Sequence, residues 1–155
     1  MVTDLTANAD TASAMTHPMP PMPPLLRWTL SVIDIGMIAY WSISAIALAG
    51  LIALPQSAMY DGYGTPIIDA WNWSFAPLDL IFSVCGLIAI RLASRNDPRW
   101  HGAAVVSLAL TFCAGLMAVA FWAIRGEYNP SWWVPNLLLM ALPLIWLPSL
   151  IRNMR

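Results

Sequence analysis

Two aspartates, Asp34 and Asp79, interrupt segments that are otherwise apolar enough to span a lipid bilayer. A carboxylate in hydrocarbon costs about 2.5 kcal/mol or more on insertion scales, so such residues usually serve a function. Aromatic residues follow the first acid and precede the second. A protonated carboxyl beside aromatic faces suits protonation of an alkene or an epoxide, because the π faces stabilise the resulting carbocation and a dry site protects it.

Helical geometry places the two acids at neighbouring depths. With a rise of about 1.5 Å per residue, Asp34 lies roughly 10 Å above the level of Arg27, and Asp79 lies roughly 18 Å above that of Arg91. Helix axes in a bundle are about 8–10 Å apart, so we expect the two carboxyls to meet directly or through a water. The side chains expected to bind a substrate around them are Tyr40, Trp41, Asn72, Trp73, Phe75, Thr111, Trp122 and Asn136.

The sequence leaves open which acid carries the proton. Pro77 places Asp79 near a helix start, with Asn72 or Ser74 as the expected cap, and the helix dipole there favours the carboxylate. Burial favours the neutral acid, and a second nearby carboxylate favours one shared proton. A purely structural role, with the acids hydrogen-bonded between helices, is the alternative, although serine, threonine or asparagine would serve it at a lower insertion cost.

The composition indicates an integral membrane protein. Of the 155 residues, 59% are apolar and only 10% are charged, and the mean hydropathy is positive. Four apolar runs, at about 28–51, 75–92, 103–124 and 133–151, each approach the ~20 residues that a helical span requires. We therefore predict an all-α fold, a four-helix bundle over residues 25–155. The proline-rich segment 1–24 is predicted to be a disordered cytoplasmic tail.

The basic residues predict the orientation. All seven are arginines, and an even number of spans places six of them on one side, with Arg125 opposite. The excess of positive charge on cytoplasmic loops therefore predicts that both termini are cytoplasmic, in a multi-pass protein of the inner (plasma) membrane.

Several classes of chemistry have no sequence signal. Cys85 and Cys113 lie inside predicted spans without a CxxC motif, and His17 and His101 lie away from the acids, so we expect no metal site and no disulfide. Phosphate-binding glycine loops and nucleophile elbows are absent from the sequence. We accordingly expect no cofactor and no nucleic-acid partner.

Three segments carry a resemblance to a known family. Residues 34–41, 71–79 and 132–136 resemble the YvaD-like bacterial family of small four-span proteins, whose function is largely uncharacterised, over roughly residues 27–151. More loosely, the acid-bearing second span is similar to the four-helix module of emopamil-binding protein and the sigma-2 receptor. These two proteins are a lipid isomerase and a ligand-binding relative. Only Asp79 matches them by position, and the other polar catalytic residues of the isomerase have no clear counterpart in this sequence. Small membrane terpene cyclases of bacterial indole-sesquiterpenoid pathways are similar in size, span number and use of intramembrane acids.

The leading hypothesis is acid-initiated cyclisation or isomerisation of a lipophilic, terpenoid-like substrate. One aspartate would donate the proton, and the other would orient it or stabilise positive charge. The competing hypothesis is a non-catalytic protein that binds a lipid or amphiphile, or serves as an accessory subunit. Ion or proton translocation is a third hypothesis, which the scarcity of further charged residues disfavours. The expected partners are a lipophilic small molecule from the bilayer and membrane lipids, and a homo-oligomer is compatible with the sequence.

Overall fold

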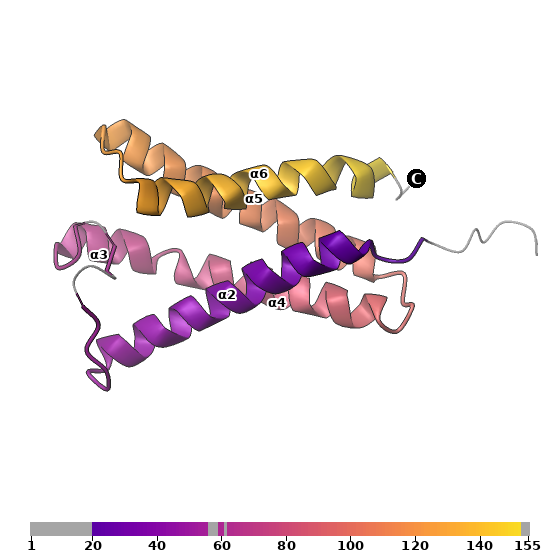
Figure 1. The fold of residues 1–155 in the computed structure, drawn as a ribbon, viewed down its shortest axis with the longest axis horizontal. Coiled ribbons are helices and arrows are strands. Elements are labelled where there is room, and N and C mark those ends of the chain that lie inside the picture. Colours follow the sequence, from indigo (N-terminus) through magenta and orange to yellow (C-terminus); the bar gives the residue numbers. More distant parts are fainter. Residues whose placement is uncertain (1–19, 56–58, 61, 153–155) are drawn as a thin grey trace, which may run out of the picture.

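The computed structural model describes residues 20–55, 59–60 and 62–152, and this part of the chain forms helices and no strands (Figure 1). The helices are α2 (Pro24–Leu48), α3 (Pro66–Trp73), α4 (Ala76–Ala93), α5 (Trp100–Arg125) and α6 (Pro130–Arg152). The all-α prediction is therefore confirmed. Residues 1–19, which hold most of the predicted tail, lie outside the described residues.

Four helical segments are long and apolar enough to cross a membrane: α2, α3 with α4, α5 and α6. The shortest has 23 residues, which corresponds to a rise of about 35 Å and exceeds a hydrocarbon core of about 30 Å. The chain is thus a multi-pass membrane protein with four spans, as the hydropathy predicts.

The observed helices begin earlier than the predicted runs. Pro24, Pro66 and Pro130 each stand at a helix start, where a proline loses no hydrogen bond because the first N–H groups of a helix have no partner. Such helix starts lie outside the apolar runs, so hydropathy alone does not predict them. The predicted runs 28–51 and 75–92 leave residues 52–74 outside any helix, whereas residues 66–73 form α3.

A break between Trp73 and Ala76 separates α3 from α4. Pro77 has no N–H to offer the carbonyl of Trp73, and its ring opposes that carbonyl, so the α-helix cannot continue through this point. Pro77 instead stands in the first turn of α4, as predicted. The predicted side-chain cap from Asn72 or Ser74 is wrong: Phe75 is the N-cap residue, and it makes no side-chain cap hydrogen bond.

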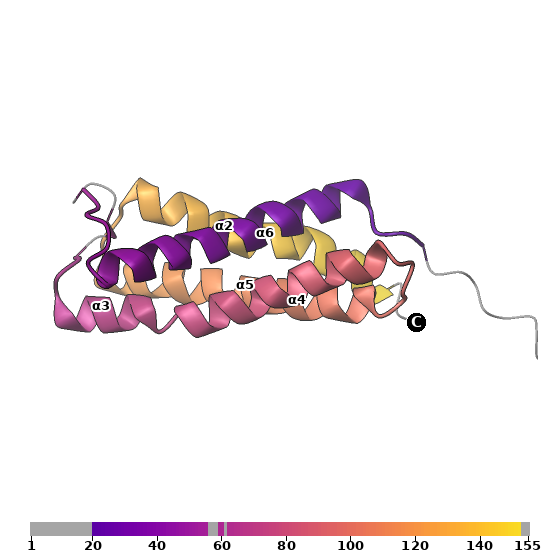
Figure 2. The ribbon, with the colours of Figure 1, turned by 90° about the horizontal axis from the view of Figure 1, so that it is seen from below.

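The spans pack in chain order, α2 on α4, α4 on α5 and α5 on α6, whereas α2 and α6 barely touch (Figures 1 and 2). Both ends of the described chain lie at the same end of the bundle (Figure 1). A close-packed apolar core fills that end, with Leu26, Leu30, Ala104 and Leu108 at most 1% exposed. The cavities described below lie toward the opposite end, near α3.

The arginines are unequally distributed between the two ends of the bundle. Arg27, Arg91 and Arg152 lie at helix ends on the side of the two described chain ends, and Arg95 and Arg99 lie in the α4–α5 turn on the same side. Arg125 ends α5 at the other side. Five arginines thus lie on one side and Arg125 lies on the other, as the sequence predicts. The cytoplasmic assignment of the side with five arginines remains a prediction.

Candidate functional site

A small chamber, here called the inner chamber, lies between all four spans and has a volume of about 60 Å³. Each span contributes to its wall. The lining residues are Met37, Tyr40, Trp41, Trp71, Asn72, Phe75, Asp79, Ala114, Ala118, Trp132, Asn136 and Leu139. Small residues of α5 leave the space, and aromatic residues of the other spans enclose it.

Asp79 is the acid of the inner chamber. It stands in the first turn of α4 and is 4% exposed. The indole Nε1 of Trp41 donates a 2.9 Å hydrogen bond to Asp79 Oδ2 across the α2–α4 contact. Oδ1 of the same carboxyl is buried and has no hydrogen-bond partner among the described residues. One oxygen is thus fixed, and the other is buried without a partner in the described part of the chain.

Aromatic contacts hold the chamber wall in place. Trp41 packs edge-on against Tyr40, with ring centroids 4.9 Å apart, and in a tilted arrangement against Trp73 at 5.2 Å. On the opposite side Trp71 stacks on Phe121 at 3.8 Å and an interplanar angle of 17°. These interlocked rings restrict rotation of the indole that holds Asp79, so the carboxyl has a defined orientation.

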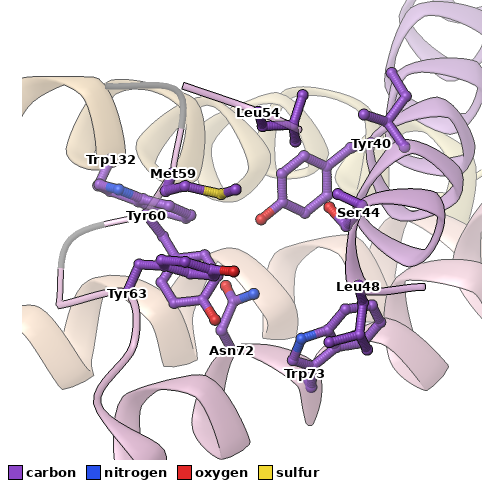
Figure 3. Close-up of a pocket in the computed structure, with 12 residues that line it drawn as sticks. Tyr40, Ser44, Leu48, Leu54, Met59, Tyr60, Tyr63, Asn72, Trp73 and Trp132 are labelled. Carbon is purple, nitrogen blue, oxygen red and sulfur yellow. The ribbon is translucent and has the colours of Figure 1, made fainter. Parts of the chain in front are cut away.

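A larger cavity, the outer chamber, adjoins the inner one toward the α3 end of the bundle and has a volume of about 210 Å³ (Figure 3). Its walls come from the end of α2, the α2–α3 loop, α3 and Trp132. The lining residues are Tyr40, Ile43, Ser44, Ala47, Leu48, Leu54, Met59, Tyr60, Tyr63, Asn72, Trp73 and Trp132. This volume exceeds the ~150 Å³ of a cavity that holds benzene.

One part of the loop wall is fixed to α3. The Tyr60 hydroxyl donates a 2.6 Å hydrogen bond to Asp69 Oδ1, and the backbone N–H of Gly64 donates to the same oxygen at 3.1 Å. Burial and the bond to Asp69 raise the pKa of Tyr60 above its ordinary value, so this hydroxyl stays neutral and remains a donor. These two bonds therefore hold Tyr60 and Gly64 in a set position against α3.

Asp34 lies elsewhere. It is fully buried on α2 against Gly86 of α4, where a β-carbon added to the glycine would overlap Asp34 Oδ2 and lie 2.9 Å from Ser107 Oγ of α5. Both carboxyl oxygens of Asp34 and the hydroxyls of Ser83 and Ser107 lack hydrogen-bond partners among the described residues. Asp34 lines neither chamber.

The expected meeting of the two acids is therefore wrong. Asp34 is opposite Gly86, and Trp41 is opposite Asp79. These two levels are seven residues apart on each helix, or about 10 Å along the axis. Depth along each helix predicts that the acids lie in adjacent layers, but the antiparallel pairing of α2 with α4 separates them by two turns.

Six of the eight predicted substrate-binding residues line a chamber. Trp41, Phe75 and Asn136 line the inner chamber, Trp73 lines the outer one, and Tyr40 and Asn72 line both.

The other two predicted substrate-binding residues, Thr111 and Trp122, line neither chamber. Thr111 is buried on α5 and donates its hydroxyl to the carbonyl of Ser107 at 2.9 Å. Trp122 packs edge-on against Trp71 behind the chamber wall, with ring centroids 5.7 Å apart.

Sequence reasoning missed several lining residues, including Tyr60, Tyr63 and Trp132. Aromatic residues near span ends commonly serve as interfacial anchors, so their position in the sequence does not indicate a cavity. The spacing of Tyr60 and Asp69 is a signal that could have indicated this loop. The two residues flank a segment rich in glycine and proline, and a hydrogen bond between them can close a short loop.

The described residues contain no group of three His, Cys, Asp or Glu side chains that could hold a metal ion. Cys85 and Cys113 are free thiols in this part of the chain. The oxygen-bearing side chains that line the two chambers are one carboxyl, two amides and several hydroxyls.

Comparison with known proteins gives a family without an assigned activity. A family model described as "Family of unknown function (DUF5360)" matches residues 26–155. The chain is 38% identical over 124 residues to "Uncharacterized protein YvaD" of Bacillus subtilis (strain 168), covering 80% of this chain and 90% of that protein. The resemblance to the YvaD-like family is thereby confirmed. No solved structure matches the chain.

Proposed function

The chain belongs to the DUF5360 family, and from this premise we propose that it is a membrane-embedded, acid-initiated isomerase or cyclase of a lipophilic, terpenoid-like substrate. One observation carries the proposal: a buried carboxyl, Asp79, lies in an aromatic chamber with one oxygen fixed by Trp41 and the other without a partner. A buried polar atom without a partner is costly, so its retention in a cavity wall suggests that a ligand engages it.

Trp41 determines which oxygen can carry the transferred proton. An indole N–H is only a donor, so Asp79 Oδ2 must accept from it. In the neutral carboxyl the carbonyl oxygen is the better acceptor, so this hydrogen bond favours Oδ2 as the carbonyl oxygen and the proton on Oδ1. That arrangement gives a donor of fixed direction, which is what general acid catalysis requires.

The proposed reaction needs no co-reactant. The O–H bond at Asp79 Oδ1 breaks, and the π electrons of a substrate alkene form a C–H bond with that proton. The resulting carbocation lies beside aromatic faces such as Trp41 and Phe75, which stabilise it through their quadrupoles. Loss of a proton from a neighbouring carbon to the carboxylate forms a new alkene, directly or after ring closure by a second alkene, and regenerates the acid.

The surroundings suit a lipophilic substrate. Both chambers have mostly apolar walls, and water exclusion protects a carbocation from hydrolysis. The sparse contact between α2 and α6 leaves the bundle least closed on the side where both helices line the chambers. We propose entry from the bilayer there, in the inner (plasma) membrane.

Asp34 receives a different role in this proposal. It lies two turns from Asp79, beside Gly86, and does not face the substrate. We therefore assign the proton donation to Asp79 alone. In this proposal Asp34 affects the reaction only indirectly, through the packing of α2 on α4 or through its charge.

The decisive experiment is turnover by purified protein in liposomes. Prenyl alcohols and their terminal epoxides are incubated with the wild type and with Asp79→Asn, and products are separated by mass spectrometry and NMR. A product isomeric with the substrate and lost in Asp79→Asn supports the proposal. Equal turnover in both proteins, or no isomerisation by well-inserted wild type, contradicts it.

Binding without turnover is the second candidate. A carboxylate among aromatic faces also suits a lipophilic amine, through ion pairing and cation–π contacts. Titration with a fluorescent hydrophobic amine separates the two functions. Amine binding that requires Asp79, in a protein without isomerase activity, assigns the binding role.

A further inference from the structure

The two chambers share three residues. Tyr40 of α2, Asn72 of α3 and Trp132 of α6 line both the outer and the inner chamber. Figure 3 shows these three side chains around the outer chamber, with the Tyr40 hydroxyl directed toward the side formed by Tyr60 and Tyr63. We call these three residues the neck, because a ligand that occupies both chambers must pass them.

The chambers differ in size and depth. The inner chamber, at about 60 Å³, is much smaller than the outer one, at about 210 Å³. The inner chamber therefore admits only the end of a chain. The outer chamber lies at the end of the bundle, beside the α2–α3 loop, where the polar part of an amphiphile can remain near the membrane interface.

The outer chamber also has hydroxyl groups that the inner one lacks. Ser44, Tyr60 and Tyr63 line only the outer chamber. Hydroxyls donate and accept hydrogen bonds, so Ser44 and Tyr63 can satisfy an alcohol, an ether or a carbonyl. The Tyr60 hydroxyl, which donates to Asp69, can only accept from a ligand.

Charge restricts the head group further. Among the described residues that line the outer chamber there is no lysine, arginine or histidine. The loop residues 56–58 and 61, which lie outside the described residues, are Gln, Ser, Ala and Asp and add no basic group. A phosphate or diphosphate needs basic partners when it leaves water, so the wall favours a neutral head.

We propose that the outer chamber is a subsite for the neutral, hydrogen-bonding head of a prenyl-type amphiphile, and that the neck directs the apolar end of that molecule into the inner chamber beside Asp79. The reacting end is then the terminal branched alkene, and prenyl diphosphates are excluded. The identity of the reacting end rests on the proposed function, whereas the orientation of the ligand can be tested by binding alone.

Photolabelling in liposomes tests the orientation. Two diazirine analogues of farnesol are used, one with the diazirine at the terminal isoprene unit and one with it beside the hydroxyl. The tail probe should label residues such as Ala114, Ala118 and Leu139, and the head probe should label Leu48, Leu54 or Met59. The reverse pattern, or labelling only of lipid-facing residues such as Ile124, overturns the proposal.

Competition tests the head group. Unlabelled farnesol should suppress both labels, and farnesyl diphosphate should not; equal suppression by the diphosphate overturns the neutral-head assignment. Tyr63→Phe removes one hydroxyl from the outer chamber and should weaken farnesol competition about threefold to tenfold. Tyr128→Phe is the matched control, since Tyr128 is exposed and lines neither chamber. Equal affinity in wild type and Tyr63→Phe, with unchanged labelled positions, removes Tyr63 from the subsite.

The outcomes separate this inference from the proposed function. Retained turnover in Asp79→Asn with the predicted labelling pattern removes the acid mechanism and keeps the head-group subsite. Turnover that depends on Asp79 with reversed labelling keeps the mechanism and removes the subsite.

Discussion

Asp34 of α2 lies directly against Gly86 of α4, at a point where any β-carbon would overlap its Oδ2 atom. The glycine therefore sets how closely α2 approaches α4 at this level. Seven residues further along α2, Trp41 donates to Asp79. Because one rigid helix carries both contacts, the Gly86 contact helps to fix the distance at which Trp41 meets its acid.

Replacing Gly86 should loosen this pair of helices. Gly86→Ala places a β-carbon against Asp34 Oδ2 and 2.9 Å from Ser107 Oγ, and we expect a loss of about 1–3 kcal/mol in the free energy of unfolding. Unfolding by SDS in mixed micelles measures it. The matched control is Gly36→Ala, because a β-carbon at Gly36 meets nothing within 4 Å.

A double variant identifies the cause. If the overlap with Asp34 is responsible, Gly86→Ala combined with Asp34→Ala should be less destabilised than the two single effects together predict, by about 1 kcal/mol or more. Strict additivity would show that the alanine disturbs α4 for another reason.

Gly115 has a similar role between α5 and α6, but against backbone. A β-carbon there would lie 2.7 Å from the Asn136 carbonyl oxygen and 2.9 Å from the Met140 nitrogen. Backbone atoms of a helix cannot rotate away, so Gly115→Ala should separate α6 from α5 and reduce the yield of folded protein more than Gly86→Ala does. Gly102→Ala on the same helix has open space and is the control. A folded yield equal to that of Gly102→Ala contradicts this prediction.

The sequence predicts the four spans because bilayer thickness imposes a length on every apolar run. It does not predict α3, since eight amphipathic residues after a turn-rich loop give too weak a signal. The acid Asp79 and most of its aromatic neighbours are predictable from composition. The pairing of Trp41 with Asp79 is not, because helix register depends on close approaches such as that at Gly86, which are properties of the packed bundle.

The stability contributed by the turn between α4 and α5 should fall at acid pH. Hydrogen bonds from the Arg99 side chain and backbone N–H lower the pKa of Asp97 from 3.8 to about 2. A carboxyl whose pKa is lowered by folding contributes stability above its unfolded value and loses it as the pH falls through the folded value. The stability difference between wild type and Asp97→Asn should therefore shrink between about pH 4 and pH 2, as followed by SDS unfolding. Since Asp97 is on the surface, the change should be small and reduced by salt. A constant difference across this window contradicts the assignment.

Substitution of the two intramembrane acids should affect turnover differently. Asp79→Asn removes the proton donor in the inner chamber and should abolish turnover while leaving a folded protein, since asparagine has nearly the same shape. Asp34→Asn changes a residue two turns away that lines neither chamber, so turnover should remain within about tenfold of the wild type. Product analysis with both variants at equal folded concentration measures the contrast. Equal, complete loss in Asp34→Asn would require a direct role for that carboxyl.

Trp41 allows the positioning of the acid to be tested apart from its presence. Trp41→Phe keeps an aromatic ring against Tyr40 and Trp73 but removes the N–H that fixes Asp79 Oδ2. Intramembrane hydrogen bonds contribute about 0.6–2 kcal/mol, so we expect destabilisation of this size and a protein that still assembles. With neither oxygen fixed, the carboxyl can rotate, and the proton no longer has a set direction.

The kinetic consequence distinguishes positioning from substrate binding. Because the inner chamber keeps its apolar wall in Trp41→Phe, KM should change little, whereas kcat should fall about tenfold to a hundredfold, as expected when a general acid loses its orientation. Trp73→Phe is the comparison, since Trp73 packs on Trp41 without a hydrogen bond to the acid. If Trp41→Phe raises KM and leaves kcat unchanged, Trp41 acts as a wall of the binding site, and the fixed orientation of Asp79 has no part in the chemistry.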